Sequence, residues 1–306
     1  MKASVVIPTY NSEKFIDECL CSIKDQTFQD FECIVVDDGS ADGTVQACRE
    51  FARSDSRFKV VCTEHSNGCG AAKGRNAGLA KAQGEYVQFV DSDDTLVPEA
   101  LEESIGFMER HGLDIAFFDA EAVNCGARQF DCWRSQMYMR RRKNYGILSG
   151  EEMFRQMVGM SNFICYAFLY AAKRTALKHP FPLIPLDEDL VFTVQNLLSA
   201  VKAGHLPKAL YRKRCRPCST LTSPLYLERT ASLARAIASL EKWGTEEASC
   251  GRIEDSSRQF LQRLLNRCQK ELEARWKLLN PAERNRLECL SDEDRTILLS
   301  RLAGKY

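Results

Sequence analysis

Short apolar runs alternate with amphipathic segments along the first 120 residues of the chain. The apolar runs are rich in β-branched and aromatic residues, and they predict strands at 3–8, 31–38, 58–64, 86–91 and 113–120. The intervening segments repeat apolar residues at helical spacing, and they predict helices at 12–28, 44–53, 71–82 and 98–110. Strands separated by single helices form right-handed crossovers. We therefore predict an α/β fold with a mostly parallel, Rossmann-like sheet and helices on both faces.

The pattern changes after these elements. Residues 121–220 are less periodic, and residues 221–306 are largely helical in character. A long helix near the end carries apolar residues on one face: Phe260, Leu264, Cys268, Leu272, Trp276 and Leu279. Ser291 is the predicted N-cap of a last helix. We predict an α/β domain over 1–220, with halves 1–120 and 121–220, followed by a C-terminal helical region.

Polar and turn-forming residues follow three of the predicted strands. They form the segments PTYN (8–11), DDGSADGT (37–44) and DSDD (91–94). In parallel sheets, ligands bind beyond the carboxyl ends of the strands, and these ends lie on one edge of the sheet. That edge is therefore the predicted binding site.

Three carboxylates, Asp91, Asp93 and Asp94, follow the fourth predicted strand within four positions. A single acidic residue there is most simply a solvated loop residue or the N-cap of the next helix. Three together repel one another unless a cation compensates them. Asp-x-Asp supplies the oxygen ligands that Mg²⁺ and Mn²⁺ take together with substrate phosphates, so the segment favours a metal–diphosphate site.

Two further segments at this edge are less specific. In VVDDGSADGT, Asp37 or Asp38 can accept hydrogen bonds from a nucleoside, or the segment can be a polar turn. The Gly-rich NGCGAAKGRNAG (67–78) fails the dinucleotide fingerprint, because Lys73 stands where the third glycine belongs. Arg75, at the start of the following helix, suits contact with phosphate.

Composition and charge narrow the class of protein. Lys and Arg total 42, as do Asp and Glu, so nothing in the net charge indicates a nucleic-acid partner. The 14 cysteines are mostly scattered singly through apolar segments, and one C-x-x-C, Cys215 to Cys218, leaves a zinc site as a minor alternative to reduced thiols. No apolar run is long enough to span a bilayer, so we expect a cytoplasmic protein.

The motifs VVIPTYN, VVDDGSADGT and NGCGAAKGRNAGLAKAQGEYVQFVDSDD, in this order, closely resemble the family 2 glycosyltransferases, which have the GT-A fold. The match covers about the first 120 residues. A weaker match continues to LDEDLVFTVQNLL (186–198) and LYRKRCRPCST (210–220). The resemblance implies inverting transfer of a sugar from a nucleotide-diphospho sugar, most often UDP-linked, to an acceptor hydroxyl. The predicted setting is synthesis of a cell-surface polysaccharide or glycolipid.

The resemblance also implies site residues. Those implied for nucleotide-sugar binding are Pro8, Tyr10, Asn11, Asp37, Asp38, Arg75, Asp91 and Ser92. Asp93 is implied as the direct ligand of Mn²⁺ or Mg²⁺, with Asp91 closer to the ribose and to metal-bound water. Asp94 is expected to support this loop.

The reaction needs a base that takes the proton of the acceptor hydroxyl. DEDLVF offers Asp187, Glu188 and Asp189, and the family's Glu-Asp-x-x-Phe segment favours Asp189, with Glu188 second. The alternative is that these acids serve the N-terminus of the following helix, where its dipole favours negative charge. Both roles are compatible.

The predicted helix at 258–279 has a basic face. Its basic residues are Arg258, Arg263, Arg267, Lys270, Arg275 and Lys277. The simpler interpretation is a helix packed on the domain with a solvated face. The alternative is a peripheral contact with anionic lipid at the inner face of the membrane, which would suit a lipid-linked rather than a free glycan acceptor.

Two other functions are alternatives to sugar transfer. A sugar-1-phosphate nucleotidyltransferase would carry an N-terminal Gly-rich loop ending in Arg, where this chain has PTYNSEKF. A non-catalytic nucleotide-sugar-binding protein would have lost the Asp-x-Asp or the base motif, and both are intact.

Overall fold

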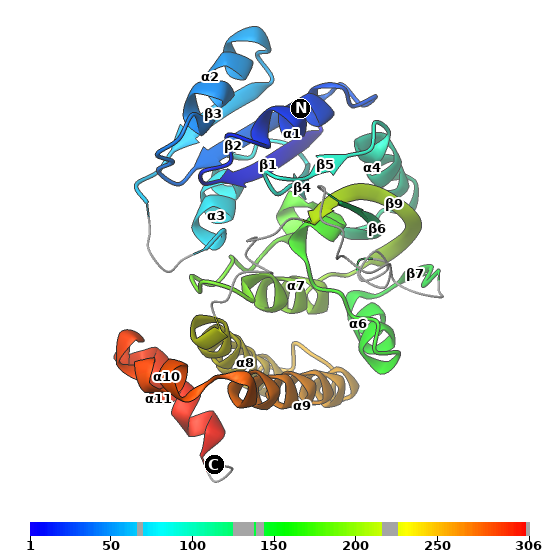
Figure 1. Cartoon of the computed structure of the whole chain (residues 1–306). Coiled ribbons are helices and arrows are strands. Elements are labelled where there is room, and N and C mark those ends of the chain that lie inside the picture. The colour runs from blue at the N-terminus through cyan, green and yellow to red at the C-terminus, as the bar shows by residue number, and fades with distance from the viewer. Residues whose placement is uncertain (66–69, 125–137, 139–143, 216–225, 304–306) are drawn as a thin grey trace.

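The structure is a computed structural model that describes residues 1–65, 70–124, 138, 144–215 and 226–303 (Figure 1). The strands of these residues form one nine-stranded sheet in the order β3-β2-β1-β4-β8-β6-β9-β5, and β7 pairs with β9. Their bounds are β1 (Ala3–Thr9), β2 (Phe31–Asp37), β3 (Phe58–Cys62), β4 (Tyr86–Phe89), β5 (Thr95–Leu96), β6 (Ile115–Asn124), β7 (Ile147–Leu148), β8 (Tyr170–Lys173) and β9 (Ala203–Cys215).

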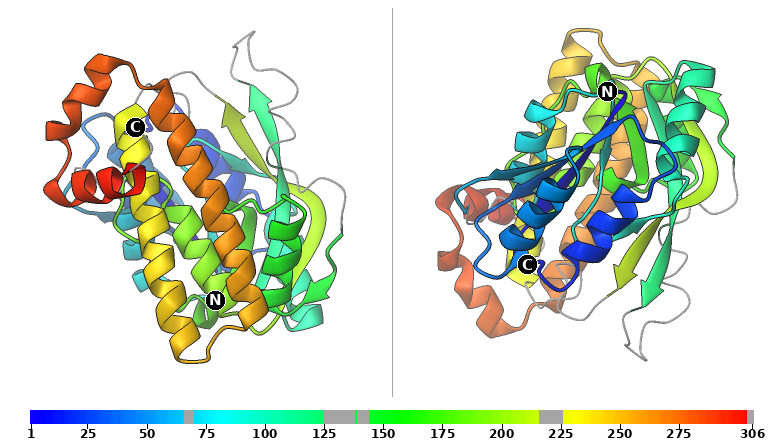
Figure 2. Two further views of the ribbon diagram at one scale, coloured as in Figure 1. Left: turned by 90° about the horizontal axis from the view of Figure 1, so that it is seen from below. Right: turned by 90° about the horizontal axis from the view of Figure 1, so that it is seen from above.

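Helices cover both faces of this sheet (Figures 1 and 2). Their bounds are α1 (Ile16–Lys24), α2 (Thr44–Ser54), α3 (Ala72–Lys81), α4 (Ala100–His111), α6 (Gly150–Gly159), α7 (Glu188–Leu198), α8 (Tyr226–Ser249), α9 (Asp255–Leu278), α10 (Pro281–Arg284) and α11 (Asp292–Leu302). Short 3₁₀ turns lie at Ala167–Leu169, Arg174–Ala176 and Asn285–Cys289.

The alternation of side chains along β1 divides the core in two. Val5 and Ile7 are buried on the face that α1, α2 and α4 cover. Val6 is buried on the opposite face, in a second apolar cluster that α3, α6 and α7 share with α8 and α9. Because successive side chains of a strand point to opposite faces, a strand that is buried on both faces, such as this one, belongs at the centre of a sheet covered on both sides.

The predicted α/β fold with a mostly parallel sheet is confirmed. β1, β2, β3 and β4 pair in parallel as expected. The expected fifth strand, now β6, does not adjoin β4, because β8 lies between them and runs antiparallel to both. The two-residue strands β5 and β7 also pair antiparallel, with β9. Local periodicity does not reveal these strands, because β5 and β7 have only two residues each and β8 is far in the chain from its neighbours β4 and β6.

The first helix is shorter than predicted. The sequence places its start at Ser12, a candidate N-cap, but the helix begins at Ile16 and Phe15 occupies the N-cap position, so that prediction is wrong. The carbonyl of Ser12 accepts from the N–H groups of Phe15 and Ile16, which makes a separate turn before the helix. The side chain of Ser12 is buried, with its Oγ 2.7 Å from Oγ of Ser92. It therefore braces the loop that follows β4.

The C-terminal helices form a layer beneath α7 (Figure 1). α8 packs against α9 and α7, and α9 also packs against α6. Ser291 caps α11 as predicted, because its Oγ accepts from the N–H of Asp294. Among the residues that the structure describes, no helix combines the length and the apolar character needed to cross a membrane. The division into domains at residue 220 stays a prediction.

Candidate functional site

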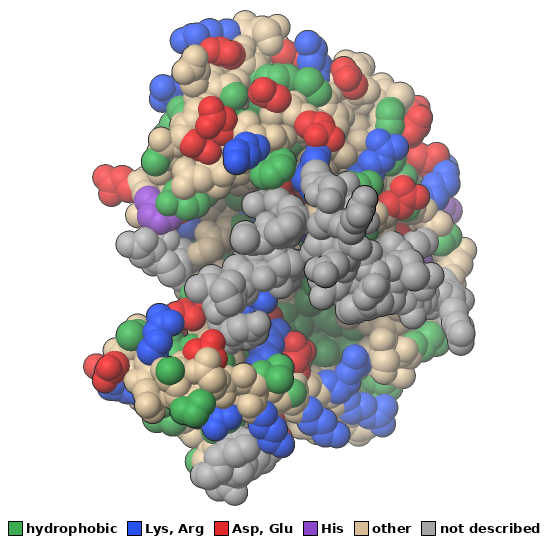
Figure 3. Space-filling view, in the orientation of Figure 1, with side chains coloured by type: hydrophobic (Ala, Val, Ile, Leu, Met, Phe, Trp, Pro, Cys, Tyr) green, Lys and Arg blue, Asp and Glu red, His purple; other side chains and the backbone are tan. Residues whose placement is uncertain are grey.

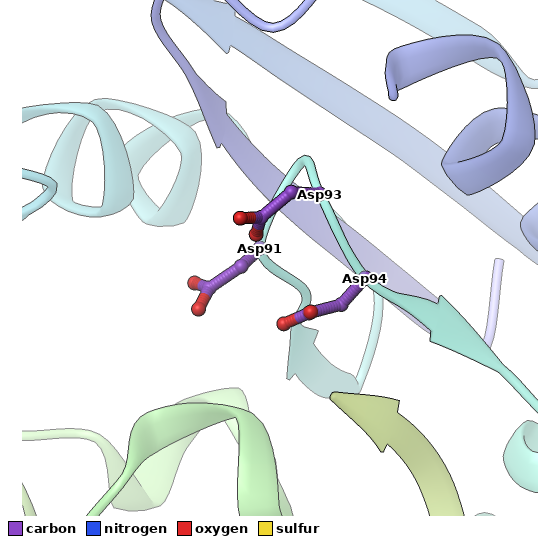
Figure 4. A group of neighbouring side chains, drawn as sticks. All are labelled: Asp91, Asp93 and Asp94. Carbon is purple, nitrogen blue, oxygen red and sulfur yellow. The ribbon is translucent and has the colours of Figure 1, made fainter. Parts of the chain in front are cut away.

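The loop between β4 and β5 brings three carboxylates together (Figure 4). One oxygen from each of Asp91, Asp93 and Asp94 lies within 4.8 Å of the others. The loop is tight, because the N–H of Asp94 donates to the carbonyl of Asp91 over 3.1 Å. Clustered carboxylate oxygens are the donor set that Mg²⁺ and Mn²⁺ prefer, so these residues fit a divalent metal.

Two buried cations hold Asp91. Arg75 Nη2 lies 2.9 Å from its Oδ1, and Lys213 Nζ lies 3.1 Å from its Oδ2. Burial alone would raise the pKa of Asp91, but Lys213 and Arg75 hold this pKa at about 2. Asp91 is therefore ionised throughout the neutral range, as a group that binds cations must be.

Asp94 lies deeper than its neighbours and supports the loop. Its carboxylate accepts from Tyr211 Oη over 2.6 Å, from Lys213 Nζ over 2.8 Å and from the N–H of Arg214 over 2.8 Å. Burial, together with Asp93 and Asp91, raises the pKa of Asp94 to about 7 against the pull of Lys213. These contacts anchor the loop to β9 and agree with the supporting role expected of Asp94.

Arg75 joins this loop to a second group of acids. Its Nη1 lies 2.7 Å from Glu188 Oε1 and 3.0 Å from Asp189 Oδ1. The guanidinium is buried, and its Nε has no hydrogen-bond partner among the described residues. Burial alone would lower its pKa, but the three carboxylates raise it. Arg75 is a fixed positive charge shared between the two acidic loops.

Close helix packing puts Arg75 in this place. α3 lies directly on β1, and a Cβ added at Gly78 would come within 2.3 Å of Val6 Cγ1. At Gly74 an added Cβ would come within 3.0 Å of Pro8 Cβ. Only glycine allows this approach, and the short distance brings the first turn of α3 to the strand ends.

The second acidic loop runs into the first turn of α7, where Glu188 and Asp189 lie. Asp187 occupies the N-cap position with φ 59°, a left-handed conformation that is uncommon for a residue other than glycine. Burial and the charge of Asp189 raise the pKa of Glu188 to about 8, and burial also raises the pKa of Asp189 although Arg75 opposes it. These two acids therefore have a higher affinity for protons than Asp91 has.

The C-terminal helices hold the second loop from behind. Ser232 of α8 accepts from the N–H of Leu186 over 3.0 Å and donates to the carbonyl of the same residue. Arg275 of α9 lies 3.3 Å from Asp187 Oδ2 and donates to the carbonyl of Arg229 over 3.1 Å. The position of the Glu188–Asp189 pair thus depends on Ser232 and Arg275, which follow it by more than forty residues.

The residues predicted to hold the nucleoside lie at the ends of β1 and β2. Tyr10 is 48% exposed and stacks on His65, with the ring centroids 4.4 Å apart. His65 Nδ1 lies 3.1 Å from Asp38 Oδ2. Asn11, with φ 48°, accepts from the N–H of Ala41 and so ties the two loops together. Tyr10, Asp38 and His65 present an aromatic and polar surface at this edge.

The remaining predicted residues have structural contacts. Asp37 is buried and accepts from the N–H groups of Gly39 and Ser40, which shapes the loop after β2. Pro8 packs against α3, and Ser92 packs against Ser12. These three therefore shape the site through its backbone.

Lys213, Tyr211 and His65 were not expected at the site. Lys213 and Tyr211 are two residues apart on β9, so both side chains point to the same face and reach Asp94. The period of two in LYRKRC was the available signal, but nothing in the sequence shows that β9 lies beside the DSDD loop. His65 follows β3 and had only its place at a strand end to mark it.

Three features of the sequence lie wholly or partly outside the described residues. These are Cys218 of the C-x-x-C pair, the basic run RRRK at 140–143, which is predicted to be a solvated loop or to steer an anionic acceptor, and residues 67–69 of the Gly-rich segment 67–78.

Comparison with protein families and curated proteins identifies relatives. The model of glycosyl transferase family 2 matches residues 4–175, which is more than half of the chain. The poly(ribitol-phosphate) β-N-acetylglucosaminyltransferase TarS of Staphylococcus aureus is 43% identical over 126 residues, 40% of this chain and 22% of that protein. The uncharacterized glycosyltransferase EpsJ of Bacillus subtilis is 29% identical over 227 residues, 72% of this chain and 63% of that protein. The chain thus spans less than two thirds of the length of these relatives.

Solved structures share the fold over nearly the whole chain. The crystal structure of S. aureus TarS 1–349 in complex with UDP has a TM-score of 0.68 and 25% identity, and it covers 99% of this chain and 79% of that one. The mannosyltransferase PcManGT of Pyrobaculum calidifontis, in complex with GDP-Man and Mn²⁺, has a TM-score of 0.59 at 18% identity, with coverage of 100% and 88%. At that identity the second likeness concerns the fold alone.

Proposed function

Because the chain belongs to glycosyl transferase family 2, we propose that it transfers a sugar from a nucleotide-diphospho sugar to an acceptor hydroxyl, with inversion. The observation that carries the proposal is the shared contact of Arg75 with Asp91 on one side and with Glu188 and Asp189 on the other. One buried cation thereby joins a loop suited to a diphosphate with a pair of acids suited to proton transfer. A UDP-linked donor is favoured, because the TarS fragment, a relative at 25% identity, has been solved with UDP and with UDP-GlcNAc.

The donor would lie along the strand ends. Tyr10 and Asp38 would hold the nucleoside, with Asn11 and Asp37 keeping their loops in place. The diphosphate would lie beside Asp91 and Arg75, whose unpartnered Nε–H is a further donor. A buried donor without an acceptor is costly, which supports a role for Arg75 in binding an anion.

We propose that Asp93 and Asp91 hold Mn²⁺ or Mg²⁺ together with the donor. When bound, such a metal supplies positive charge that stabilises the departing nucleoside diphosphate. The clustered oxygens of Asp91, Asp93 and Asp94 support this assignment. Ser92 and Asp94 would keep the loop rigid through their contacts with Ser12 and β9.

Asp189 is the proposed base, with Glu188 second. As the acceptor oxygen attacks the anomeric carbon, the carboxylate of Asp189 would take the hydroxyl proton. Its contact with Arg75 fixes the orientation of the carboxylate. The raised pKa of Asp189 supports this role, because a base with very low proton affinity removes protons poorly.

The acceptor is proposed to be a glycan or lipid-linked intermediate of a cell-surface polysaccharide or glycolipid, with the chain acting in the cytoplasm. The basic face of α9 supports a peripheral contact with an anionic membrane surface, because Arg258, Arg263, Arg267 and Lys270 are all exposed. Lys and Arg side chains gather at the lower edge of the molecule, in the region of α9 (Figure 3). Co-sedimentation with vesicles, with and without anionic lipid, tests this contact separately from activity.

A panel of UDP-, GDP- and TDP-sugars tests the donor. Binding is measured by calorimetry with Mn²⁺, with Mg²⁺ and with EDTA, and slow donor hydrolysis is followed by release of the nucleotide. We expect one nucleotide class to bind and EDTA to weaken that binding. If none of the donors binds and EDTA changes nothing, the proposed function is wrong.

A further inference from the structure

Lys213 lies among the three carboxylates of the DSDD loop. Its Nζ is 2.8 Å from Asp94 Oδ2, 3.1 Å from Asp91 Oδ2 and 3.8 Å from Asp93 Oδ1. The side chain is only 11% exposed, and its Nζ lies 5.2 Å from the ring centre of Phe168. The ammonium group therefore stands in the same group of oxygens that would receive a divalent metal.

A metal and this ammonium group cannot both use these oxygens fully. Mg²⁺ requires carboxylate oxygens at about 2.0–2.1 Å in a near-octahedral arrangement. Two of the three carboxylates already accept from Lys213, and a second cation so close to the ammonium group would be repelled by it. Unless Lys213 has another partner, its ammonium group therefore opposes binding of a metal.

Each carboxylate that Lys213 contacts has other partners. Asp91 keeps Arg75 at 2.9 Å, and Asp94 keeps Tyr211 Oη and the N–H of Arg214. Each of these carboxylates therefore keeps a hydrogen-bond donor when Lys213 is removed. A cation that meets this condition can be replaced by another cation, whereas a cation whose loss leaves a buried carboxylate without a donor serves only to stabilise the fold.

We propose that Lys213 is the resident counter-ion of this site and that a divalent metal replaces it only when a nucleoside diphosphate binds. A diphosphate brings negative oxygens beside the loop, and a lysine ammonium group is a strong point charge for phosphate. The ligand thus provides a new partner for Lys213 while the metal takes the carboxylates. Metal and nucleotide then strengthen each other's binding, and Lys213 sets the size of this coupling.

The inference rests on the proposed function, because it requires a nucleoside diphosphate at this site. Binding of Mn²⁺ is measured from the electron paramagnetic resonance signal of the free ion, with and without UDP, so the readout does not depend on turnover. The variants are Lys213→Met and, as a matched control on the same strand, Lys208→Met. Lys208 pairs with Glu103 near the surface and lies away from the acidic loop.

In the wild-type protein and in Lys208→Met we expect weak binding of Mn²⁺ alone and much tighter binding with UDP. In Lys213→Met we expect Mn²⁺ alone to bind about tenfold more tightly, within the usual range of coupling between two ligands, and UDP to add less. Equal or weaker binding of Mn²⁺ alone to Lys213→Met would overturn the inference. If UDP binds none of these proteins at any metal concentration, it is the UDP-linked donor of the proposed function that fails, and the same comparison is made with the nucleoside diphosphate that binds in the donor panel.

Two further variants separate charge from folding. Lys213→Gln keeps much of the length and a hydrogen-bond donor without the charge, and Lys213→Arg keeps the charge. Affinity for Mn²⁺ alone should follow charge, so that the glutamine variant resembles the methionine variant and the arginine variant resembles the wild type. The opposite order overturns the inference. Thermal melting of each variant identifies any that fails to fold, and the inference is then judged on the others.

Discussion

Two acidic loops share Arg75 but differ in how their charges are balanced. The loop at Asp91–Asp94 forms ion pairs with two largely buried cations, Arg75 and Lys213. Among the described residues, the only cation that pairs with Glu188 and Asp189 is the shared Arg75. The two sets of carboxylates therefore differ in their affinity for protons. The pKa of Asp91 is held at about 2, while that of Glu188 is raised to about 8 by burial and by Asp189.

The difference shows that local surroundings, rather than residue type, set the proton affinities of the two sets of carboxylates. A group that must bind cations is useful when it stays ionised, and a base is useful when its affinity for a proton is appreciable. The first loop is attached to the sheet through β9, and the second to the C-terminal helices through α8 and α9. Changes to the two loops should therefore have separable effects.

Asp189→Asn is expected to have the largest effect. Loss of the base should lower the rate of transfer by about 10²–10⁴-fold, because this is the usual contribution of general base catalysis. The affinity for UDP should remain close to that of the wild type, since the donor loop keeps its cations. Steady-state transfer and calorimetry with UDP measure the two effects. Transfer at the wild-type rate would show that another group is the base, and Glu188→Gln would then be the next variant to test.

Asp93→Asn should act on the other loop, with a smaller effect. Removal of a proposed metal ligand should weaken the metal-dependent part of UDP binding by about 10–100-fold, a common cost of impairing a metal site. Asp25→Asn, on an exposed residue that follows α1, is the matched control. Calorimetry with UDP in Mn²⁺ and in EDTA separates the metal-dependent part. Equal losses in both media would argue that Asp93 does not hold the metal.

The pH dependence of transfer should reflect the second loop. Burial raises the pKa of Asp189, and burial together with Asp189 raises the pKa of Glu188 to about 8; because the two acids titrate as a pair, the pair loses its second proton only near pH 8. Activity should therefore fall as the pH decreases and the pair takes up protons, by up to about tenfold per pH unit. Glu188→Gln removes one charge of the pair and should move this limb to lower pH. An unchanged limb in the variant would mean that a group outside the pair controls it.

The sequence predicted the first half of the fold better than the second. The strands β1 to β4 are apolar runs separated by single helices, and this arrangement leaves few alternatives. β8 and β9 enter the sheet from distant parts of the chain, and β9 includes polar segments such as YRKR. Such strands are stabilised by their neighbours rather than by their own pattern, so periodicity does not reveal their place.

The same limit applies to the site. Asp91, Asp93 and Asp94 are adjacent in sequence, and their mutual repulsion was reason enough to expect a cation. The cations themselves come from residues 16 and more than 100 positions away, Arg75 and Lys213. Arg75 was expected near the nucleotide, but its contact with Glu188 joins positions 113 residues apart, which only the folded chain brings together.

Arg275→Met should have the smallest effect, and it tests whether the C-terminal helices set the position of the second loop. The ion pair with Asp187 is partly exposed, so its contribution to holding the second loop in place should be about 1 kcal/mol. Loss of this contribution should lower the rate constant for transfer about fivefold. Donor affinity should not change, because the first loop is attached to β9. Arg267→Met, on an exposed residue of the same helix, is the control and should leave both quantities unchanged. Steady-state kinetics and melting temperatures distinguish the alternatives. If the contact is purely structural, Arg275→Met should lower the melting temperature without changing the rate constant. If the contact positions the loop, Arg275→Met should lower the rate constant, and Arg275→Lys should restore part of it.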